Sequence, residues 1–378
     1  MRTWDVPFPG ALRRFFATEA ASGVVLLGAT IVALAWANSP WGDGYRDLWS
    51  TAVAVGPHDL RHWVDDALMA VFFFVVGVEV KRELVLGELR DPRAAALPLL
   101  AALGGMAMPA LLFLAVNAGH PGSHGWGVPM ATDIAFATGV VALLGRRVPS
   151  GLRLFLLTLA VADDIGAIVV IAVAYAGSID VVALGLAALA LLAIVGLRRL
   201  GVTSLVPYVA LAGATWVATF ESGVHATIAG VALGLLVPAA AAERFEQRLH
   251  PLSAFVVLPV FALANAGLEL RWGMLDGPGA ARVAVGVALG LVVGKAVGIT
   301  VASWLAIRLR LGLLPSGATW RHIVGIAALG GIGFTVALFV SGLAFDQAVL
   351  ADAAVVGIIA GSLAAAAVGA ALLLRRPA

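Results

Sequence analysis

Two adjacent aspartates, Asp163 and Asp164, lie at the centre of an apolar stretch that runs over residues 152–173. The stretch is long enough to cross a bilayer as a helix, which places the pair near the membrane midplane. Ionisable side chains at that depth are costly and are typical of functional sites. Two carboxylates in a low-dielectric environment suit the binding of a small cation in competition with protons.

The composition predicts a membrane protein. Of the 378 residues, 61% are hydrophobic and only 12% are charged, about half the charged fraction of a soluble chain. Apolar stretches of about 20 residues recur from end to end, whereas the short alternating segments of a membrane β-barrel do not. The sequence therefore indicates an all-α polytopic membrane protein. With no cysteine, a disulfide framework and a thiolate metal site are both excluded.

The hydropathy pattern predicts about twelve spans. They cover residues 16–36, 63–85, 95–116, 129–144, 152–175, 181–197, 205–220, 224–239, 251–268, 283–307, 323–343 and 349–374. The longest loop is the first, at 39–62, and within it residues 50–57 carry a weak hairpin signal. We find no evident cleavage site beside the first span, and we expect that span to be an uncleaved anchor. The whole chain, 1–378, is expected to form one transmembrane transporter unit.

The positions of the basic residues predict the orientation. Nineteen of the 24 Lys and Arg residues lie in the two terminal segments or in the even-numbered loops. The odd-numbered loops carry only Arg46, Arg61, Arg271 and Arg282. By the positive-inside rule both termini are cytoplasmic, which requires an even number of spans.

The remaining basic residue, Lys295, lies near the centre of the tenth span. An arginine at this depth would stay charged, whereas a buried lysine can give up its proton. Lys295 could be a structural counter-ion for a buried carboxylate or a titrating group, and the two roles are compatible. Glycines at every fourth position, 286, 290, 294 and 298, predict a packing face that lets another helix approach Lys295 closely.

Asp133 is the fourth ionisable residue that we place at this depth. It follows Thr132 in a short span that is preceded by Pro121, several glycines and Pro129. The eleventh span is interrupted by glycines over residues 330–333. Two interrupted helices in corresponding halves of a chain are typical of inverted-repeat transporters. We therefore expect both helices to be broken, with extended backbone near 132–133 and near 330–333, and the breaks to face each other beside the aspartates and Lys295. Asp133 should lie at the positive helix ends and Lys295 at the negative ends.

Other polar residues are weaker candidates. Glu79 lies close to Arg82 at the end of the second span, where a salt-bridged helix end is a simpler role than ion attraction. His225 could titrate near neutral pH, but a hydrogen-bonded structural role is the simpler interpretation. Glu246 and His250, with Arg248 between them, could be plain surface charge or a proton-sensitive mouth.

Several stretches resemble the NhaA sodium/proton antiporters of bacterial inner membranes. They are DALMAVFF at 66–73, VEVKREL at 78–84, ATDIAFA at 131–137, ADDIGA at 162–167, SGVHAT at 222–227 and GIGFT at 331–335. The resemblance covers nearly the whole chain. It implies an inverted repeat with discontinuous spans four and eleven crossing in mid-membrane. It also implies a core from about 95–175 and 281–378, and a homodimer-forming part from about 12–94 and 176–280.

The resemblance also implies residue roles. Asp164 would bind the cation, Asp163 would pair with Lys295, and Asp133 would offset the positive ends of the facing half-helices. A cytoplasmic, pH-responsive mouth would contain Glu79, Arg82, Glu246 and His250. Gln247 stands where some members have a titratable histidine, which leaves the shape of the pH response open.

The residues themselves suggest a matching mechanism. Adjacent helical residues point roughly 100° apart, so one aspartate can face the ion path while the other meets Lys295. Sodium prefers oxygen ligands, and Asp164, Asp163 and the Thr132 hydroxyl could supply them. If protons compete for the same carboxylate, the site exchanges Na⁺ or Li⁺ for protons. No cofactor, enzymatic activity or nucleic-acid partner is expected, and the partners are the ions and the lipid bilayer.

Three other classes stay open at this point. An intramembrane aspartyl protease also needs two aspartates, but it has no use for a midplane lysine or for paired broken helices. A cation channel is usually a ring of repeated short subunits, whereas this chain carries one asymmetric site. A proton-coupled symporter of another small solute is the rival closest in mechanism.

Overall fold

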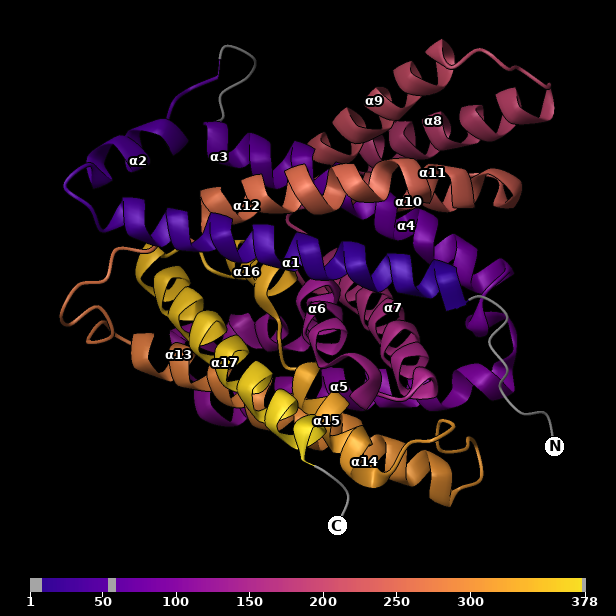
Figure 1. Cartoon of the computed structure of the whole chain (residues 1–378). Helices are drawn as coiled ribbons and strands as arrows, with labels where there is room; N and C mark the ends of the chain where they lie inside the picture. Colours follow the sequence, from indigo (N-terminus) through magenta and orange to yellow (C-terminus); the bar gives the residue numbers. More distant parts are fainter. Residues whose placement is uncertain (1–8, 54–58, 376–378) are drawn as a thin grey trace. The chain divides into compact units, whose positions relative to one another are not determined.

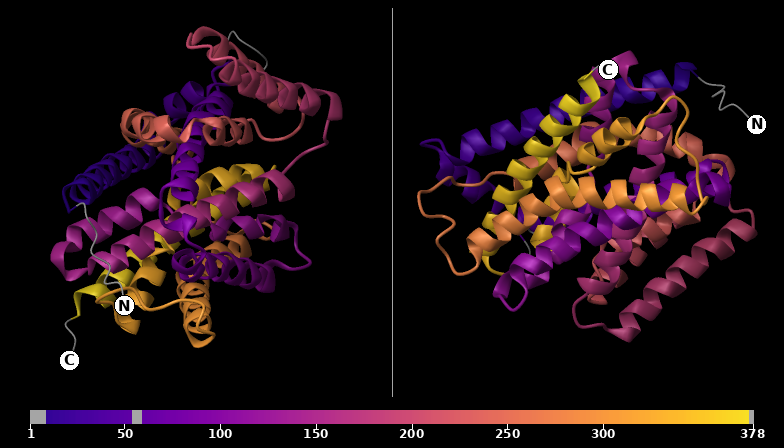
Figure 2. Two further views of the ribbon diagram at one scale, coloured as in Figure 1. Left: turned by 90° about the vertical axis from the view of Figure 1, so that its right-hand side faces the viewer. Right: turned by 90° about the horizontal axis from the view of Figure 1, so that it is seen from below.

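The computed structural model describes residues 9–53 and 59–375, and these residues are helical almost throughout (Figures 1 and 2). The helices are α1 (Pro9–Ala37), α2 (Gly42–Trp49), α3 (Leu60–Trp63), α4 (Met69–Val85), α5 (Pro92–Asn117), α6 (Ile134–Leu144), α7 (Ser150–Ala174), α8 (Val181–Arg199), α9 (Val206–Glu221), α10 (Thr227–Leu236), α11 (Ala239–Leu252), α12 (Leu258–Asn265), α13 (Ala280–Leu289), α14 (Lys295–Arg308), α15 (Trp320–Leu329), α16 (Phe334–Ala344) and α17 (Ala348–Leu374). Within the described ranges no strand forms, and the only β pairing is an isolated antiparallel bridge between Ala52 and Asp59. The predicted hairpin at 50–57 lies partly outside the described residues.

Single π-helical turns continue three of the helices. They lie at Val64–Leu68 before α4, at Ser253–Val257 between α11 and α12, and at Gly290–Gly294 between α13 and α14. A 3₁₀ helix at Pro121–Met130 precedes α6. Single π-helical turns are frequent at functional sites, and the π turn at Gly290–Gly294 ends directly before Lys295.

The membrane-protein prediction is confirmed. Seven described helices are long and apolar enough to cross a membrane, and two bent helix pairs raise the number to nine. Three further predicted spans coincide with α4, α9 and α10, which have 17, 16 and 10 residues. A helix needs about 20 residues to cross the hydrocarbon region. The exact count of twelve therefore stays a prediction, as does the inverted repeat.

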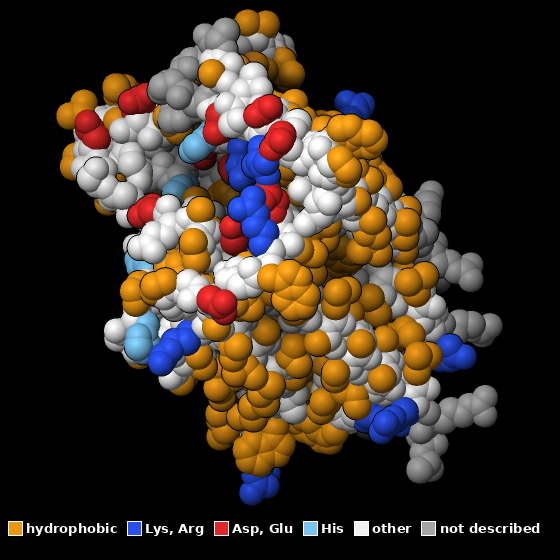
Figure 3. Space-filling model, turned by 90° about the vertical axis from the view of Figure 1, so that its left-hand side faces the viewer, with side chains coloured by type: hydrophobic (Ala, Val, Ile, Leu, Met, Phe, Trp, Pro, Cys, Tyr) orange, Lys and Arg blue, Asp and Glu red, His pale blue; other side chains and the backbone are white. Residues whose placement is uncertain are grey.

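Large apolar side chains are abundant on the surface. Val173, Leu143 and Leu192 are 79%, 79% and 66% exposed, which would be costly in water over so wide an area. Figure 3 shows hydrophobic side chains spread over much of one face, with most of the charged side chains gathered in one region. This distribution is what a lipid-facing surface requires.

Two compact units can be distinguished by internal contacts, and each is described by itself. In the first, which comprises Met1–Gly42, Glu88–Ala167 and Asn265–Ala378, α1 packs on α6, α5 on α13 and α14, and α17 on α13, α15 and α16. In the second, which comprises Asp43–Gly87 and Ile168–Ala264, α4 packs on α10 and α11, and α8 on α9. The division into a transport core and a dimer-forming part stays a prediction.

The ninth span begins earlier than the sequence predicts. Residues Ala239–Asn265 form one apolar span that includes a π turn, whereas the predicted span covers 251–268. The prediction began too late because Glu243, Arg244 and Glu246 depress the local hydropathy. The helix continues through them because Ala239–Ala242 is a run of the strongest helix former.

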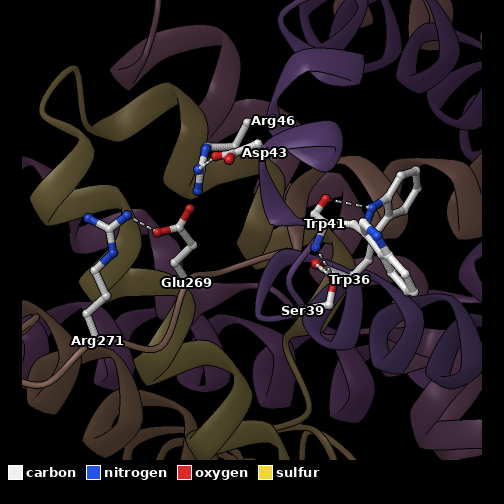
Figure 4. Close-up of polar contacts among 7 residues, drawn as sticks. All are labelled: Trp36, Ser39, Trp41, Asp43, Arg46, Glu269 and Arg271. Carbon is white, nitrogen blue, oxygen red and sulfur yellow. Dashed lines mark hydrogen bonds and ion pairs between the residues drawn. The ribbon is translucent and has the colours of Figure 1, made fainter.

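Short polar contacts organise the chain where α1 ends (Figure 4). The Trp36 indole N–H donates to the Trp41 carbonyl at 3.2 Å, and the Ser39 hydroxyl accepts from the Trp41 N–H at 3.1 Å. Elsewhere in the figure, Arg46 pairs with Asp43, and Arg271 pairs with Glu269. Two of the four basic residues in the odd-numbered loops thus have an acidic neighbour. The orientation itself stays a prediction, because the positive-inside rule counts basic residues and is little affected by acidic neighbours.

The four-glycine ladder packs against α5, as predicted. A Cβ atom at Gly298 would collide with the Gly104 carbonyl, and one at Gly294 would lie 2.7 Å from the Pro109 Cα. At Gly290 it would lie 2.6 Å from the Pro129 Cβ. The missing side chains therefore allow α5 and Lys295 to come close together.

We expect Gly298→Ala to destabilise the protein by about 1–3 kcal/mol, because an added methyl has no room between the two backbones. Thermal unfolding of the purified protein in detergent measures the change. The matched control is Gly185→Ala in α8, where a Cβ meets nothing within 4 Å. The control should be neutral or slightly stabilising, since alanine is the better helix former. Equal unfolding temperatures for the two variants would contradict the close packing.

Candidate functional site

Two helix breaks face each other inside the first unit. The 3₁₀ helix Pro121–Met130 and α6 are bent by 42° at their break, and α15 and α16 are bent by 48° at theirs. The backbone N–H of Asp133 donates to the Ile332 carbonyl at 2.6 Å, and the Thr132 hydroxyl donates to the Gly330 carbonyl at 2.8 Å. Each break therefore supplies partners for polar groups that the other leaves without helical hydrogen bonds. The predicted positions of both breaks are confirmed.

The two breaks differ in backbone conformation, and one expectation about them is wrong. Ala131 and Asp133 are extended, with ψ angles of 148° and 104°. Gly330 and Gly333 instead remain in the right-handed helical region, with ψ angles of −17° and −4°. The second break is a turn, because the Gly331 and Ile332 N–H groups still bond to carbonyls three residues back.

Asp133 closes the N-terminal ends of two half-helices. One carboxylate oxygen accepts the Phe136 N–H of α6 at 3.1 Å. The other accepts the N–H and the hydroxyl of Thr335, in the first turn of α16, at 3.0 and 2.7 Å. Helix N-termini carry a partial positive charge, so a buried carboxylate between them is well compensated. The structure thus places Asp133 where the charge argument predicts it.

Lys295 is fully buried and lies among oxygen atoms. Its Nζ donates to both carboxylate oxygens of Asp163, at 2.9 and 2.8 Å, and to the Thr132 hydroxyl at 2.9 Å. The Thr132 hydroxyl in turn bonds the Gly330 carbonyl at the C-terminal end of α15. Lys295 therefore reaches the negative end of that half-helix through Thr132. The fold brings these residues together from α7, α14 and the two breaks.

Asp163 and Asp164 have different surroundings although they are neighbours in α7. Asp163 is 1% exposed and faces Lys295, whereas Asp164 is 6% exposed. The charge of Asp164 also acts on Lys295. Adjacent helical residues point about 100° apart, so the two carboxylates leave α7 in different directions, and Asp163 points toward the ammonium group of Lys295.

The residues predicted for the mouth lie in the second unit. The Arg82 guanidinium donates to Glu246 at 2.8 Å and to Glu83 at 2.9 Å. Glu79 interacts electrostatically with Arg82, and His250 with Glu246. All four predicted residues thus belong to one charged network. Outside it, a ring nitrogen of His225 lies 2.7 Å from the Tyr175 carbonyl, which fits the structural interpretation of this histidine.

Sequence reasoning missed several members of these networks. Glu83 was overlooked as a partner of Arg82, although it lies beside Arg82 in the chain. Thr335 ends the GIGFT motif, but its donation to Asp133 cannot be inferred without the position of α16. Ser362 in α17, which accepts a hydrogen bond from the Gly333 N–H at 3.2 Å, carries no sequence signal at all.

The side chains near the breaks offer oxygen atoms that could bind a cation. In the part of the chain that the structure describes, no three His, Cys, Asp or Glu side chains are grouped as for a resident metal ion. Asp163, Asp164 and Thr132 instead offer carboxylate and hydroxyl oxygens beside unwound backbone. Hard cations such as Na⁺ prefer oxygen ligands.

Comparison with known proteins gives consistent matches. Residues 13–373 match the family model described as Na⁺/H⁺ antiporter 1. The chain is 46% identical to the Na⁺/H⁺ antiporter NhaA of Shewanella loihica, over 95% of each chain. It is 45% identical to NhaA of Rhodopirellula baltica, over 98% of this chain and 94% of that protein. It is also 45% identical to NhaA 3 of Frankia alni, over 96% and 88%.

Proposed function

The chain belongs to the Na⁺/H⁺ antiporter 1 family, and we propose that it is a secondary active transporter that exchanges cytoplasmic Na⁺ or Li⁺ for external protons. One observation carries the proposal. Two facing helix breaks are closed by Asp133 at the N-terminal ends and by Lys295 and Thr132 at a C-terminal end, beside Asp163 and Asp164. Half-helices that meet around ionisable groups are the form that ion sites take in transporters of this kind.

We assign the roles as follows. Asp164 binds the cation, with oxygen ligands from Thr132, Asp163 and the unwound backbone. Asp163 holds Lys295 while the site is empty or protonated. Asp133 keeps the two helix N-termini together without binding the ion directly. The carboxylate binds either Na⁺ or a proton. If the transporter opens the site to the other side of the membrane only when one of them is bound, the two ions are exchanged without an ion leak.

We propose that the exchange is electrogenic. If Lys295 or Asp163 changes protonation together with Asp164, more than one proton moves for each Na⁺. The membrane potential then drives the cycle with about 2.3 kcal/mol per charge per 100 mV. In proteoliposomes, an imposed potential that is negative on the side from which Na⁺ is removed should accelerate Na⁺ extrusion, because net positive charge moves toward that side, and the opposite potential should slow it.

We further propose that the transporter lies in the bacterial inner membrane as a homodimer, with both termini in the cytoplasm. The network of Arg82, Glu79, Glu246 and His250 would then lie at the cytoplasmic mouth. A change in the charge of His250 or Glu246 would alter the contacts of Arg82, and this is the basis on which we infer regulation by pH. Charge reversal of the flanking basic residues, followed by accessibility labelling of the termini, tests the orientation.

Na⁺ binding should weaken as the pH falls, because protons compete for the same carboxylate. Binding should also release protons. Isothermal titration calorimetry of the purified protein, in buffers of different ionisation enthalpy, measures both effects. The apparent binding enthalpy should depend on the buffer, and an enthalpy that is the same in every buffer would count against competition. KCl at equal ionic strength is the control titration.

The rival functions give different results. A proton-coupled symporter of an organic solute would acidify the vesicle interior only when its solute is added. A channel would show single-channel currents and no saturation with Na⁺. An intramembrane protease would cleave peptides in detergent, and this activity would disappear with Asp133→Asn as well as with Asp164→Asn.

A further inference from the structure

The break between α15 and α16 exposes backbone groups that need partners inside the protein. Its carbonyls at Gly330 and Ile332 accept hydrogen bonds from Thr132 and Asp133 of the opposite break. The N–H of Gly333 has its partner in another helix and not in the opposite break. It donates to the hydroxyl oxygen of Ser362 in α17 at 3.2 Å. Ser362 is 6% exposed.

The surroundings of this hydrogen bond are tightly packed. A Cβ atom at Gly331 would collide with the Leu291 carbonyl, in the π turn before Lys295, and would lie 3.0 Å from the Ala365 Cβ of α17. A Cβ at Gly361, beside Ser362, would lie 3.1 Å from the Ala288 Cα. The break is therefore held between α17 and the turn that carries Lys295.

Gly333 is also the N-cap residue of α16, which begins at Phe334. The next residues bring the Thr335 N–H and hydroxyl to Asp133, at 3.0 and 2.7 Å. Only Phe334 separates Gly333, which contacts Ser362, from Thr335, which contacts Asp133. A shift of Gly333 away from α17 is thus transmitted to the hydrogen bonds that keep Asp133 in place.

We propose that Ser362 is a positioning residue of the ion site, which fixes the start of α16 against α17 so that Thr335 stays bonded to Asp133. Ser362 does not touch the cation. It acts on the geometry of the two breaks, and its effect is on ion binding. This inference rests on the proposed exchange function and extends it to a residue outside the charged cluster.

Ser362→Ala tests the proposal, because it removes only the acceptor of the Gly333 N–H. The apparent KM for Na⁺ should rise at least about five-fold, because the buried N–H of Gly333 is left without its acceptor in the conformation that binds Na⁺. The maximal rate should change by less than the KM does. The pH profile of exchange should move, because proton and Na⁺ share the site. Ser362→Thr keeps a hydroxyl acceptor and should restore most of the affinity.

Ser341→Ala is the matched control. Ser341 is 3% exposed in α16, and its hydroxyl donates to the Leu338 carbonyl of its own helix at 2.8 Å. This variant removes an equally buried hydroxyl without touching the break. Its KM and pH profile should stay within about two-fold of those of the unmodified protein.

Exchange is measured in proteoliposomes as Na⁺-driven proton movement over a range of Na⁺ concentrations and pH values, and thermal unfolding is recorded for each variant. Equal KM and pH profile for Ser362→Ala and Ser341→Ala would overturn the positioning role. If Ser362→Ala does not fold, Ser362→Cys takes its place, with similar volume and a weak acceptor. Absence of exchange by the unmodified protein would refute the proposed function itself, whereas exchange with no difference between the serine variants refutes only this inference.

Discussion

Asp164→Asn is expected to abolish sodium-coupled proton movement. The amide has nearly the size and hydrogen-bonding capacity of the carboxyl group, but it can neither carry the charge that attracts Na⁺ nor exchange a proton for it. The expected loss is complete at every Na⁺ concentration. Uptake of radioactive Na⁺ into proteoliposomes with an acidic interior, where the imposed pH gradient drives the exchange, measures it. Asp163→Asn should be inactive or severely impaired, since it leaves Lys295 without its carboxylate.

Asp346→Asn is a suitable control for the loss of one negative charge. Asp346 is exposed between α16 and α17, away from the two breaks, and its replacement should leave uptake within about two-fold of normal. Folding of each variant is checked by its thermal unfolding. If Asp164→Asn exchanged ions normally at saturating Na⁺, Asp164 would not be the cation-binding carboxylate.

Lys295→Met should destabilise the protein by about 3–5 kcal/mol, because it leaves the buried Asp163 carboxylate without its counter-ion. The pair is 0% and 1% exposed in its side chains, with a separation of 2.8 Å. Thermal unfolding in detergent, with the unmodified protein as the reference, measures the change.

The double variant Lys295→Met, Asp163→Asn separates stability from transport. With both charges removed no unpaired ion is left in the interior, and such replacements are often close to neutral. Most of the lost stability should return, while exchange should not. A double variant as unstable as Lys295→Met alone would show that the ion pair is not the cause of the destabilisation.

Much of the candidate site could be predicted from the sequence because ionisable residues are so expensive in apolar helices. Asp133, Asp163, Asp164 and Lys295 are conspicuous for that reason alone, and the glycines near 330–333 indicate where a helix is interrupted. The charge of helix ends then predicts that Asp133 lies at N-termini. The hydrogen bonds to Phe136 and Thr335 agree with this argument.

Other features depend on tertiary packing and leave no trace in the sequence. The π turn at Gly290–Gly294, which ends directly before Lys295, has a sequence that also fits ordinary helix. The break at Gly330–Gly333 is a turn, whereas the sequence predicts extended backbone there. Glycine and isoleucine alone do not indicate whether local hydrogen bonds survive at a helix break. Ser362 is one small polar residue in an apolar helix, and only the position of Gly333 gives it a partner. Short helices such as α10 also leave the number of spans uncounted by length, because they have fewer residues than a membrane crossing needs.

Sodium-dependent dequenching of a ΔpH-sensitive dye tests the central claim most directly. Everted membrane vesicles from a host without its own Na⁺/H⁺ antiporters are energised, and NaCl or LiCl is added at a series of pH values. Vesicles that contain this protein should lose their proton gradient on addition of Na⁺ or Li⁺, with a marked dependence on pH, and those with Asp164→Asn should not. Equal responses to NaCl and KCl, or no response at any pH from properly folded protein, would contradict the account.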